Sequence, residues 1–224
     1  MNHLRSRLAA LLLALLANGL VLSDAGNAQN VARDYYASAG DRAATAALRN
    51  LDRFHYQPAM RHLRNGKYKF ALADLEFMLK YFPNHPQALA AIAEVGLAAK
   101  RPEIAEQPIK EALALYPQHD ETYVIYGTFL QQRGQVDAAI AEYKKALRID
   151  PQSAYAHYNL GLAYFDRKDY QQANKHAQEA YKLGVGFPAL RTKLQAAGAW
   201  KPGSADTPGS AASAQQEASD GAKE

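Results

Sequence analysis

The sequence of 224 residues predicts an all-α fold built from four helical hairpins of equal length, followed by one more helix. Three observations support this prediction. Prolines follow amphipathic runs at intervals of 34 residues, at Pro83, Pro117 and Pro151. Small residues recur in the same register, and the apolar residues between them have helical spacing. Self-similarity with a period of this length indicates an array of repeated helix pairs.

The small residues occupy fixed positions when each repeat is counted from Asp52, Pro86, Asp120 or Ala154. Position 20 is alanine throughout: Ala71, Ala105, Ala139 and Ala173. Position 8 is Ala59, Ala93, Gly127 and Gly161, and position 27 is Met78, Ala112, Ala146 and Ala180. Position 15, where the chain must turn, is Gly66, Lys100, Gly134 and Lys168. Small residues at these offsets let two helices approach closely, while larger neighbours fill the seam.

The third repeat shows the helical spacing most clearly. One face of its first helix carries Tyr123, Tyr126, Gly127 and Leu130, and one face of its second carries Ala139, Ile140, Tyr143, Ala146, Leu147 and Ile149. The fourth repeat has the same pattern. Ser153 and Asp169 stand where N-caps are expected, and Pro86 suits the first turn of a helix.

Two prolines depart from the pattern. Pro58 predicts that the first helix of repeat one begins near Gln57 or is kinked there. Pro108 lies deeper in the second helix of repeat two, which it should shorten or bend. After the fourth repeat, Leu190 and Leu194 have the spacing of a helix that covers the end of the array.

The small and large residues at positions 8, 20, 27 and 32, over residues 52 to about 187, resemble a tetratricopeptide repeat (TPR) array. The resemblance implies a right-handed α-solenoid of four helix hairpins with a C-terminal cap helix. The repeats would span residues 52–85, 86–119, 120–153 and 154–187, and the cap helix residues 188–200. It also implies a concave groove, lined mainly by each first helix, that binds an extended or helical segment of another protein.

The two ends of the chain lie outside the repeats. Residues 1–28 have the pattern of a secretory signal, with Arg5 and Arg7 before an apolar run and small residues before a cut after Ala25 or Ala28. The apolar run, from Leu8 to Leu22, is shorter than the roughly 20 residues that a bilayer span needs. We therefore expect a periplasmic or secreted protein, and the alternative is an uncleaved inner-membrane anchor.

The segments beside the repeats have different compositions. Residues 29–51 form an N-terminal segment that we expect to be helical from Asp41 and loose before it. Residues 201–224 have no large apolar side chain and are predicted to be a disordered tail.

The sequence does not indicate catalysis. Because it has no cysteine, thiolate metal sites, cysteine nucleophiles and a lipid anchor are excluded, and it contains no glycine-rich phosphate loop or nucleophile elbow. A net charge of +4 is too small to indicate nucleic-acid binding. We expect no enzyme activity, no cofactor, no bound metal and no small-molecule substrate. A remote alternative is a small metal-dependent enzyme that uses His55 and His62.

The family geometry places positions 2, 5, 6, 9, 12 and 13 of each first helix on the concave side. From these positions we predict a partner-binding groove that includes Tyr56, Met60, Glu94, Val124, Thr128, Gln131, Tyr155, Tyr158, Asn159, Leu162 and Phe165. The TPR cofactors of heat-shock chaperones hold a C-terminal carboxylate with Lys, Arg and Asn at positions 2, 5, 6 and 9. Only Asn159 matches that set, so capture of a carboxylate tail is disfavoured.

The expected partner is therefore an apolar or amphipathic protein segment, with Tyr56, Tyr155, Tyr158 and Phe165 as aromatic anchors. Packing between repeats is an equal alternative for Tyr158 and Phe165, and the N-terminal segment could fill the groove. The sequence thus predicts a non-enzymatic, exported scaffold that acts in assembly or regulation of the cell envelope. The alternative is a membrane-tethered or self-associating scaffold.

Overall fold

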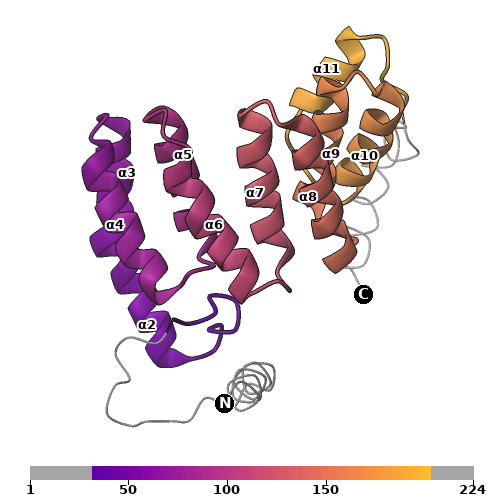
Figure 1. Ribbon diagram of the computed structural model, residues 1–224. Coiled ribbons are helices and arrows are strands. Elements are labelled where there is room, and N and C mark those ends of the chain that lie inside the picture. The colour runs from indigo at the N-terminus through magenta and orange to yellow at the C-terminus, as the bar shows by residue number, and fades with distance from the viewer. Residues whose placement is uncertain (1–31, 203–224) are drawn as a thin grey trace, which may run out of the picture. The chain divides into compact units, whose positions relative to one another are not determined.

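The computed structural model describes residues 32–202, which form helices and loops and, within that range, no strand (Figure 1). The all-α prediction is confirmed. The predicted signal and all but the first two residues of the predicted tail lie outside the described residues. The elements are α2 (Arg42–Leu51), η1 (Asp52–Tyr56), α3 (Gln57–Arg64), α4 (Tyr68–Tyr81), α5 (Pro86–Ala98), α6 (Glu103–Leu115), α7 (Asp120–Gln132), α8 (Val136–Ile149), α9 (Ala154–Asp166), α10 (Tyr170–Lys182) and α11 (Ala189–Ala196).

The helices pair as the register predicts: α3 with α4, α5 with α6, α7 with α8, and α9 with α10. The alanines at position 20, Ala71, Ala105, Ala139 and Ala173, are all fully buried. The residue at position 15 of every repeat has a positive φ, with values of 67° at Gly66, 57° at Lys100, 75° at Gly134 and 62° at Lys168. Each hairpin therefore closes with one residue in the left-handed region.

Pro58 is accommodated by a π-helical turn. Helix α2 begins at Arg42 after the N-cap Asp41, continues through η1 and runs on into α3. The N–H of Gln57 donates to the carbonyl of Asp52 five residues earlier. A proline ring clashes with the carbonyl of the fourth residue before it, and a wider turn relieves that clash. The α-helical geometry of α3 thus begins at Gln57, as predicted, but within a longer helical run.

Of the two effects predicted for Pro108, a shorter helix or a bent one, the shorter helix is wrong and the bend stays a prediction. Helix α6 has 13 residues, as many as α10, and Pro108 stands inside it. Its neighbours Ala105, Ile109 and Ala112 are fully buried. Burial of this face outweighs the one backbone hydrogen bond that proline removes.

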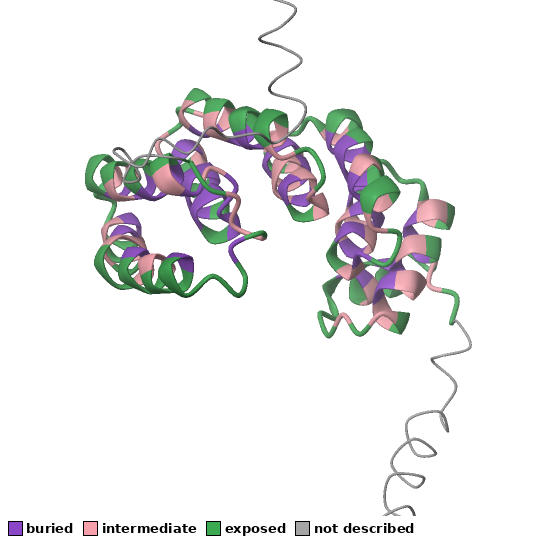
Figure 2. Ribbon diagram, turned by 90° about the horizontal axis from the view of Figure 1, so that it is seen from below, coloured by how far each residue is buried: buried purple, intermediate pink, exposed green. Residues whose placement is uncertain are grey.

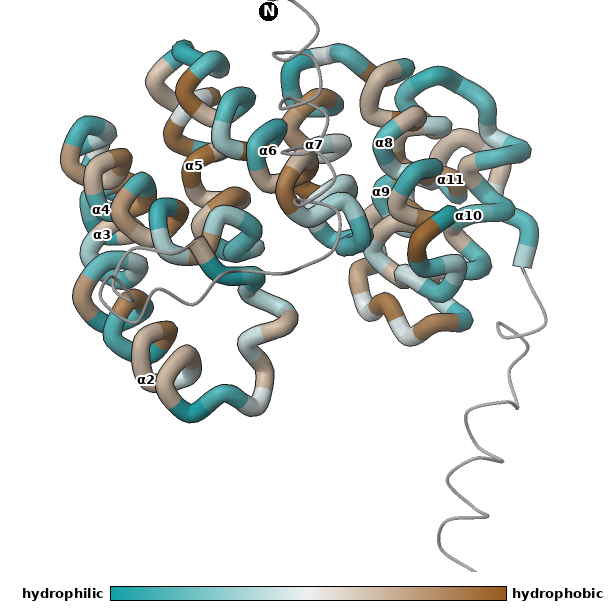
Figure 3. Tube along the Cα trace, turned by 60° about the horizontal axis from the view of Figure 1, so that its bottom comes forward, coloured by the Kyte–Doolittle hydropathy of each residue, from teal (hydrophilic) through white to brown (hydrophobic). Residues whose placement is uncertain are grey.

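The buried apolar residues form two clusters that meet on α7. The first runs from Ala44 to Ala112 and includes Phe129, and the second runs from Val124 to Leu194 and includes Leu130. Buried residues lie on the sides of the helices that face one another (Figure 2), and hydrophilic residues cover the other sides (Figure 3). Two neighbouring residues of one helix, Phe129 and Leu130, thus belong to different cores.

Helix α11 covers the end of the last hairpin. Leu190 and Leu194 are fully buried, and a Cβ added to Gly161 of α9 would lie 2.6 Å from Leu190 Cδ2. The helix is shorter than the predicted range of residues 188–200. Small residues at position 8 therefore make room for the next element even at the end of the array.

Residues 32–41, which we call the strap, bind the loops between hairpins. The backbone N–H of Tyr35 donates to Asn84 Oδ1 at 2.8 Å, and Asn84 Nδ2 donates to Asp34 Oδ1 at 2.7 Å. His119 Nε2 lies 2.9 Å from Asp34 Oδ2, and the Tyr36 hydroxyl donates to Glu121 Oε2 at 2.7 Å. The expectation that this part of the chain is loose is wrong, because Asp34 joins polar groups on both sides of α5 and α6.

Candidate binding pocket

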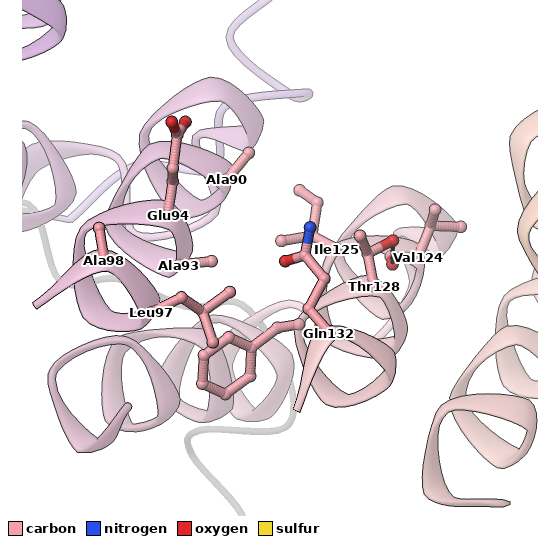
Figure 4. Close-up of a pocket in the computed structure, with 10 residues that line it drawn as sticks. Ala90, Ala93, Glu94, Leu97, Ala98, Val124, Ile125, Thr128 and Gln132 are labelled. Carbon is pink, nitrogen blue, oxygen red and sulfur yellow. Dashed lines mark hydrogen bonds between the residues drawn. The ribbon is translucent and has the colours of Figure 1, made fainter. Parts of the chain in front are cut away.

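A pocket of about 690 Å³ lies between α5 and α7, the first helices of the second and third hairpins (Figure 4). Helix α5 contributes Ala90, Ala93, Glu94, Leu97 and Ala98, and α7 contributes Val124, Ile125, Thr128, Phe129 and Gln132. These residues recur at intervals of three and four along each helix, so each set forms one face. Three alanines on α5 leave the space that larger side chains would fill.

The pocket has apolar walls and few polar groups. Among its ten lining residues, Glu94 carries the one charge, and its side chain is exposed at the rim. The Thr128 hydroxyl donates to the Val124 carbonyl at 2.9 Å and accepts from Tyr143 and from Asn159 at 3.3 and 3.4 Å. The remaining hydrogen-bonding capacity thus comes from Glu94 and Gln132, which suits a ligand that is mostly apolar.

The structure brings only some of the predicted groove residues together. Glu94, Val124 and Thr128 line the pocket. Tyr56 and Met60 are half-buried against the first core cluster, and Leu162 and Phe165 are half-buried against the second. Asn159 is linked to the pocket through Thr128.

Both ends of the Gln131 side-chain amide form hydrogen bonds with neighbouring side chains. Its Oε1 accepts from the Tyr143 hydroxyl at 3.0 Å, and its Nε2 donates to Asp166 Oδ2 at 2.7 Å. This side chain positions the third and fourth hairpins relative to each other, and a ligand would have to break both bonds to use it.

Of the two alternatives for Tyr158, exposure in the groove and packing within the array, the structure has the second. This side chain is 7% exposed and packs edge-on against the rings of Tyr181 and Phe187. The turn at the end of the fourth repeat brings Phe187 onto it, which the 34-residue register did not indicate. Tyr155 is 60% exposed and remains available.

Two pocket residues fall outside the expected concave positions. Ala93 and Phe129 occupy positions 8 and 10 of their repeats. The signal for them in the sequence is the run of alanines in α5, which opens a space beside the larger residues of α7. The strap contributes no lining residue, so this part of the N-terminal segment does not fill the pocket.

The two histidines of the remote metal alternative each lie against a phenylalanine. His55 Nδ1 is 3.0 Å from Asp74 Oδ1 and its ring is 4.2 Å from that of Phe77, while the His62 ring is 5.4 Å from Phe70. Within residues 32–202, no cluster of three or more His, Asp or Glu side chains could hold a metal ion. In the same range, no helix combines the length and apolarity of a membrane span.

Sequence profiles match most of the repeat region. One described as "TPR repeat" matches residues 130–168, and two described as "Tetratricopeptide repeat" match residues 56–120 and 154–184. Together they cover just over half of the chain. An uncharacterised protein of Haemophilus influenzae is 29% identical over 112 residues, which are 47% of this chain and 58% of that protein. The chain thus spans little more than half the length of this curated relative.

Solved structures with the same fold include PilW and PilF. PilW, a widely conserved type IV pilus biogenesis factor, is 25% identical with a TM-score of 0.53, over 66% of this chain and 71% of that chain. PilF of Pseudomonas aeruginosa is 22% identical with a TM-score of 0.53, over 65% of this chain and 66% of that chain. TPR proteins are typically non-enzymatic scaffolds that bind protein or peptide partners. With its four hairpins in one register, the chain belongs to the tetratricopeptide repeat family.

Proposed function

We propose that the protein is an exported scaffold that binds an apolar or amphipathic segment of a partner protein in the pocket between α5 and α7. The observation that carries this proposal is the pocket itself, with apolar walls from two neighbouring first helices and a carboxylate at its rim. Its volume of about 690 Å³ lies within the range of ligand pockets, and it takes several side chains of a peptide.

The lining determines which segment fits. Leu97 and Ile125, which are half-buried, favour aliphatic or aromatic side chains, whose burial supplies most of the binding free energy. Glu94 favours a lysine or arginine next to them. Ala90, Val124 and Ile125 stand where a carboxylate clamp would need cations or amides, so a C-terminal carboxylate is a poor ligand for this surface.

Two observations support a role in the cell envelope, in assembly or regulation of a complex there. Residues 1–28 have the pattern of a secretory signal, and the fold is similar to that of PilW, a pilus biogenesis factor. We propose a periplasmic location with the signal removed. Sequencing the N-terminus of the mature protein tests it: a start at Gly26 or Gln29 supports export, and a start at Met1 favours the membrane-tethered alternative.

The pocket is tested by filling it. Ala98→Trp places a large ring at the lining, whereas Ala114→Trp adds the same ring to an exposed site on α6 outside the lining. Crosslinking in envelope extracts, followed by mass spectrometry, identifies proteins bound to the wild type. We expect a partner that the Ala114→Trp variant retains and the Ala98→Trp variant loses.

A second step measures binding directly. Synthetic peptides that cover the crosslinked segment are titrated with the wild type and both variants by fluorescence anisotropy. Loss of about tenfold or more in affinity with Ala98→Trp, but not with Ala114→Trp, supports the pocket. Equal binding by all three proteins contradicts it.

A further inference from the structure

One stripe of each first helix is buried in every repeat except the first. Positions 3 and 10 are at most 1% exposed in repeats two to four, at Ala88, Val95, Thr122, Phe129, Ala156 and Ala163. In repeat one the same positions hold Phe54, which is 58% exposed, and Arg61, which is also exposed. The difference lies in what covers the stripe.

The stripe faces the preceding hairpin. Phe129, at position 10 of repeat three, belongs to the core cluster of the earlier repeats, although Val124 and Leu130 of the same helix belong to the later one. In each case the second helix of one hairpin contacts the first helix of the next: α4 with α5, α6 with α7, and α8 with α9. Within the described residues, no hairpin precedes α3, so its stripe is left open.

The open stripe continues onto α4. Phe70 is 60% exposed and Phe77 is 41% exposed, and they stand seven residues apart on one face of α4. His62 and His55 of the first helix lie beside them and connect them to the stripe. We call this surface of Phe54, Arg61, Phe70 and Phe77 the N-terminal flank. Three exposed phenylalanines on one flank are unusual for a surface that only faces water.

The charges around the N-terminal flank are mainly positive. Arg53 lies over the Phe54 ring at 5.3 Å, Arg61 and Lys69 are exposed beside the phenylalanines, and one exposed carboxylate, Glu76, precedes Phe77. Among the described residues, none of these three cations forms an ion pair with a carboxylate, and the nearby Asp74 is engaged by His55 at 3.0 Å. The surface therefore presents aromatic rings bordered by cations, which complements an apolar surface bordered by carboxylates.

Self-pairing fits this pattern poorly. Two N-terminal flanks facing each other would oppose Arg53, Arg61 and Lys69 with their own copies. The other end of the array, at α11, also carries positive charge, in the exposed Lys193 and in Arg191, which stacks on the rings of Tyr181 and Trp200. Like charges face each other in both arrangements, which opposes association.

We propose that the N-terminal flank docks a helix of another protein whose apolar stripe is bordered by Asp or Glu. The occupant is a helix because helices cover the equivalent stripe in the other three repeats. It is acidic because the border of the flank is basic. This second docking surface is separate from the pocket between α5 and α7, so the protein holds two partner segments at once.

The test uses two synthetic amphipathic helices of about 18 residues, or five turns, with the same leucine stripe. One has glutamate on both borders of the stripe, and the other has lysine. Fluorescence anisotropy measures their binding to the full chain, to Phe70→Ala/Phe77→Ala and to Arg61→Glu. Leu115→Ala, which removes a 58% exposed leucine from α6, is the matched control. Circular dichroism melts establish that each variant is folded.

We expect the glutamate peptide to bind about tenfold or more tightly than the lysine peptide. The double phenylalanine variant should lose about tenfold or more in affinity for it, Arg61→Glu should reverse the preference between the peptides, and Leu115→Ala should bind as the wild type does. Ala98→Trp should leave this binding unchanged, which separates the N-terminal flank from the pocket.

Three results would overturn the proposal. The first is equal binding of both peptides, or binding that survives loss of both phenylalanines. The second is a dimer in sedimentation velocity that Phe70→Ala/Phe77→Ala abolishes, because that makes a second copy the occupant. The third is co-sedimentation with phosphatidylglycerol vesicles that needs both phenylalanines while the glutamate peptide fails to bind, because that makes a lipid surface the occupant.

Discussion

The backbone of Gly127 lies directly against the ring of Tyr143: a Cβ at position 127 would come within 2.5 Å of Tyr143 Cε1. Tyr143 cannot move aside easily, because it is fully buried and its hydroxyl donates to Thr128 and Gln131. Position 8 is therefore small in the third repeat because helices α7 and α8 touch there.

We predict that Gly127→Ala destabilises the protein. Overpacking costs about 1–3 kcal/mol, which exceeds the roughly 0.5–1 kcal/mol that alanine gains over glycine in a helix. Urea unfolding measures the change in the free energy of unfolding. The double variant Gly127→Ala/Tyr143→Leu should lose less stability than the two single variants lose together, because the smaller side chain at position 143 makes room for the added methyl group. A Gly127→Ala protein as stable as the wild type would show that the ring is free to shift.

Acid should weaken the fold through His85. Burial lowers the pKa of His85 to about 4, and its Nδ1 must be unprotonated to accept the N–H of Ala88 at the start of α5. The neutral ring contributes fully above the unfolded pKa of about 6.5, and that contribution is lost as the pH falls from about 6.5 to about 4. The loss amounts to about 3 kcal/mol across that window.

Urea unfolding at several pH values measures this loss. His85→Asn keeps a side-chain acceptor at the N-cap and removes the titrating group, so its stability should fall less between pH 6.5 and 4. His176, whose pKa burial also lowers to about 4, remains in that variant and contributes to the slope that is left. An unchanged slope in His85→Asn would exclude His85 as a source of the acid sensitivity.

The strap should contribute to stability mainly through Asp34. Burial raises the pKa of Asp34, but hydrogen bonds from Asn84 and His119 outweigh that effect and hold the pKa below its usual value. The ionised carboxylate therefore stabilises the fold above about pH 4, and this stabilisation is lost as the pH falls through the lowered pKa. Asp34→Ala leaves the fully buried Asn84 side chain without its acceptor, which costs about 1–3 kcal/mol.

Thermal unfolding and hydrogen exchange of the loops at residues 82–85 and 116–119 measure the effect of Asp34→Ala. Tyr36→Phe is the matched control, since it removes an exposed hydrogen bond to Glu121 from the same strap. We expect that change to cost less than about 1 kcal/mol. If the two variants were equally stable, the network around Asp34 would add nothing beyond ordinary surface contacts.

The turns at position 15 offer a way to stabilise the protein. Lys100 and Lys168 adopt the left-handed region, with φ of 57° and 62°, at a cost that glycine avoids. Lys100→Gly and Lys168→Gly should each raise the free energy of unfolding by up to about 1 kcal/mol, after allowing for the greater freedom of glycine in the unfolded chain. Chemical denaturation of single and double variants measures it.

The opposite change at the other two turns serves as the control. Gly66 and Gly134 have φ of 67° and 75°, and a Cβ at either would have no atom within 4 Å. Any loss of stability in Gly66→Ala or Gly134→Ala therefore comes from the backbone alone, and we expect about 1–2 kcal/mol. Stability that is unaffected by all four substitutions would contradict this account of the turns.

The burial of the small residues at positions 8 and 20 was predictable because the same residue types recur at these positions in every repeat. Alanine at position 20 lies at the contact between the two helices of every hairpin, so one sequence shows the same pattern four times. The contact of Tyr158 with Phe187 was not predictable from that register, because the last position of the other repeats holds His85, His119 or Ser153 instead of a phenylalanine. The strap was missed because Asp34 is 50 residues from Asn84 and 85 from His119, and such polar contacts have no periodicity.

The place of the pocket was only partly predictable. Of the predicted groove residues, Glu94, Val124 and Thr128 line the pocket, but the richest set of aromatic residues pointed to repeat four. Large side chains there pack against one another and against Phe187, whereas the alanines of α5 leave space. A binding site forms only where the surrounding helices leave a surface uncovered. Packing between elements far apart in sequence determines where that surface lies.

The division of the core on α7 has a consequence for cooperativity. A repeat array unfolds as one unit only while each neighbouring pair is well coupled. Here the first half of the protein reaches the second through α7, where Phe129 faces one core and Leu130 the other. A peptide held between α5 and α7 touches both halves, so its binding free energy adds to their coupling. We therefore expect a bound peptide to make the two halves unfold together.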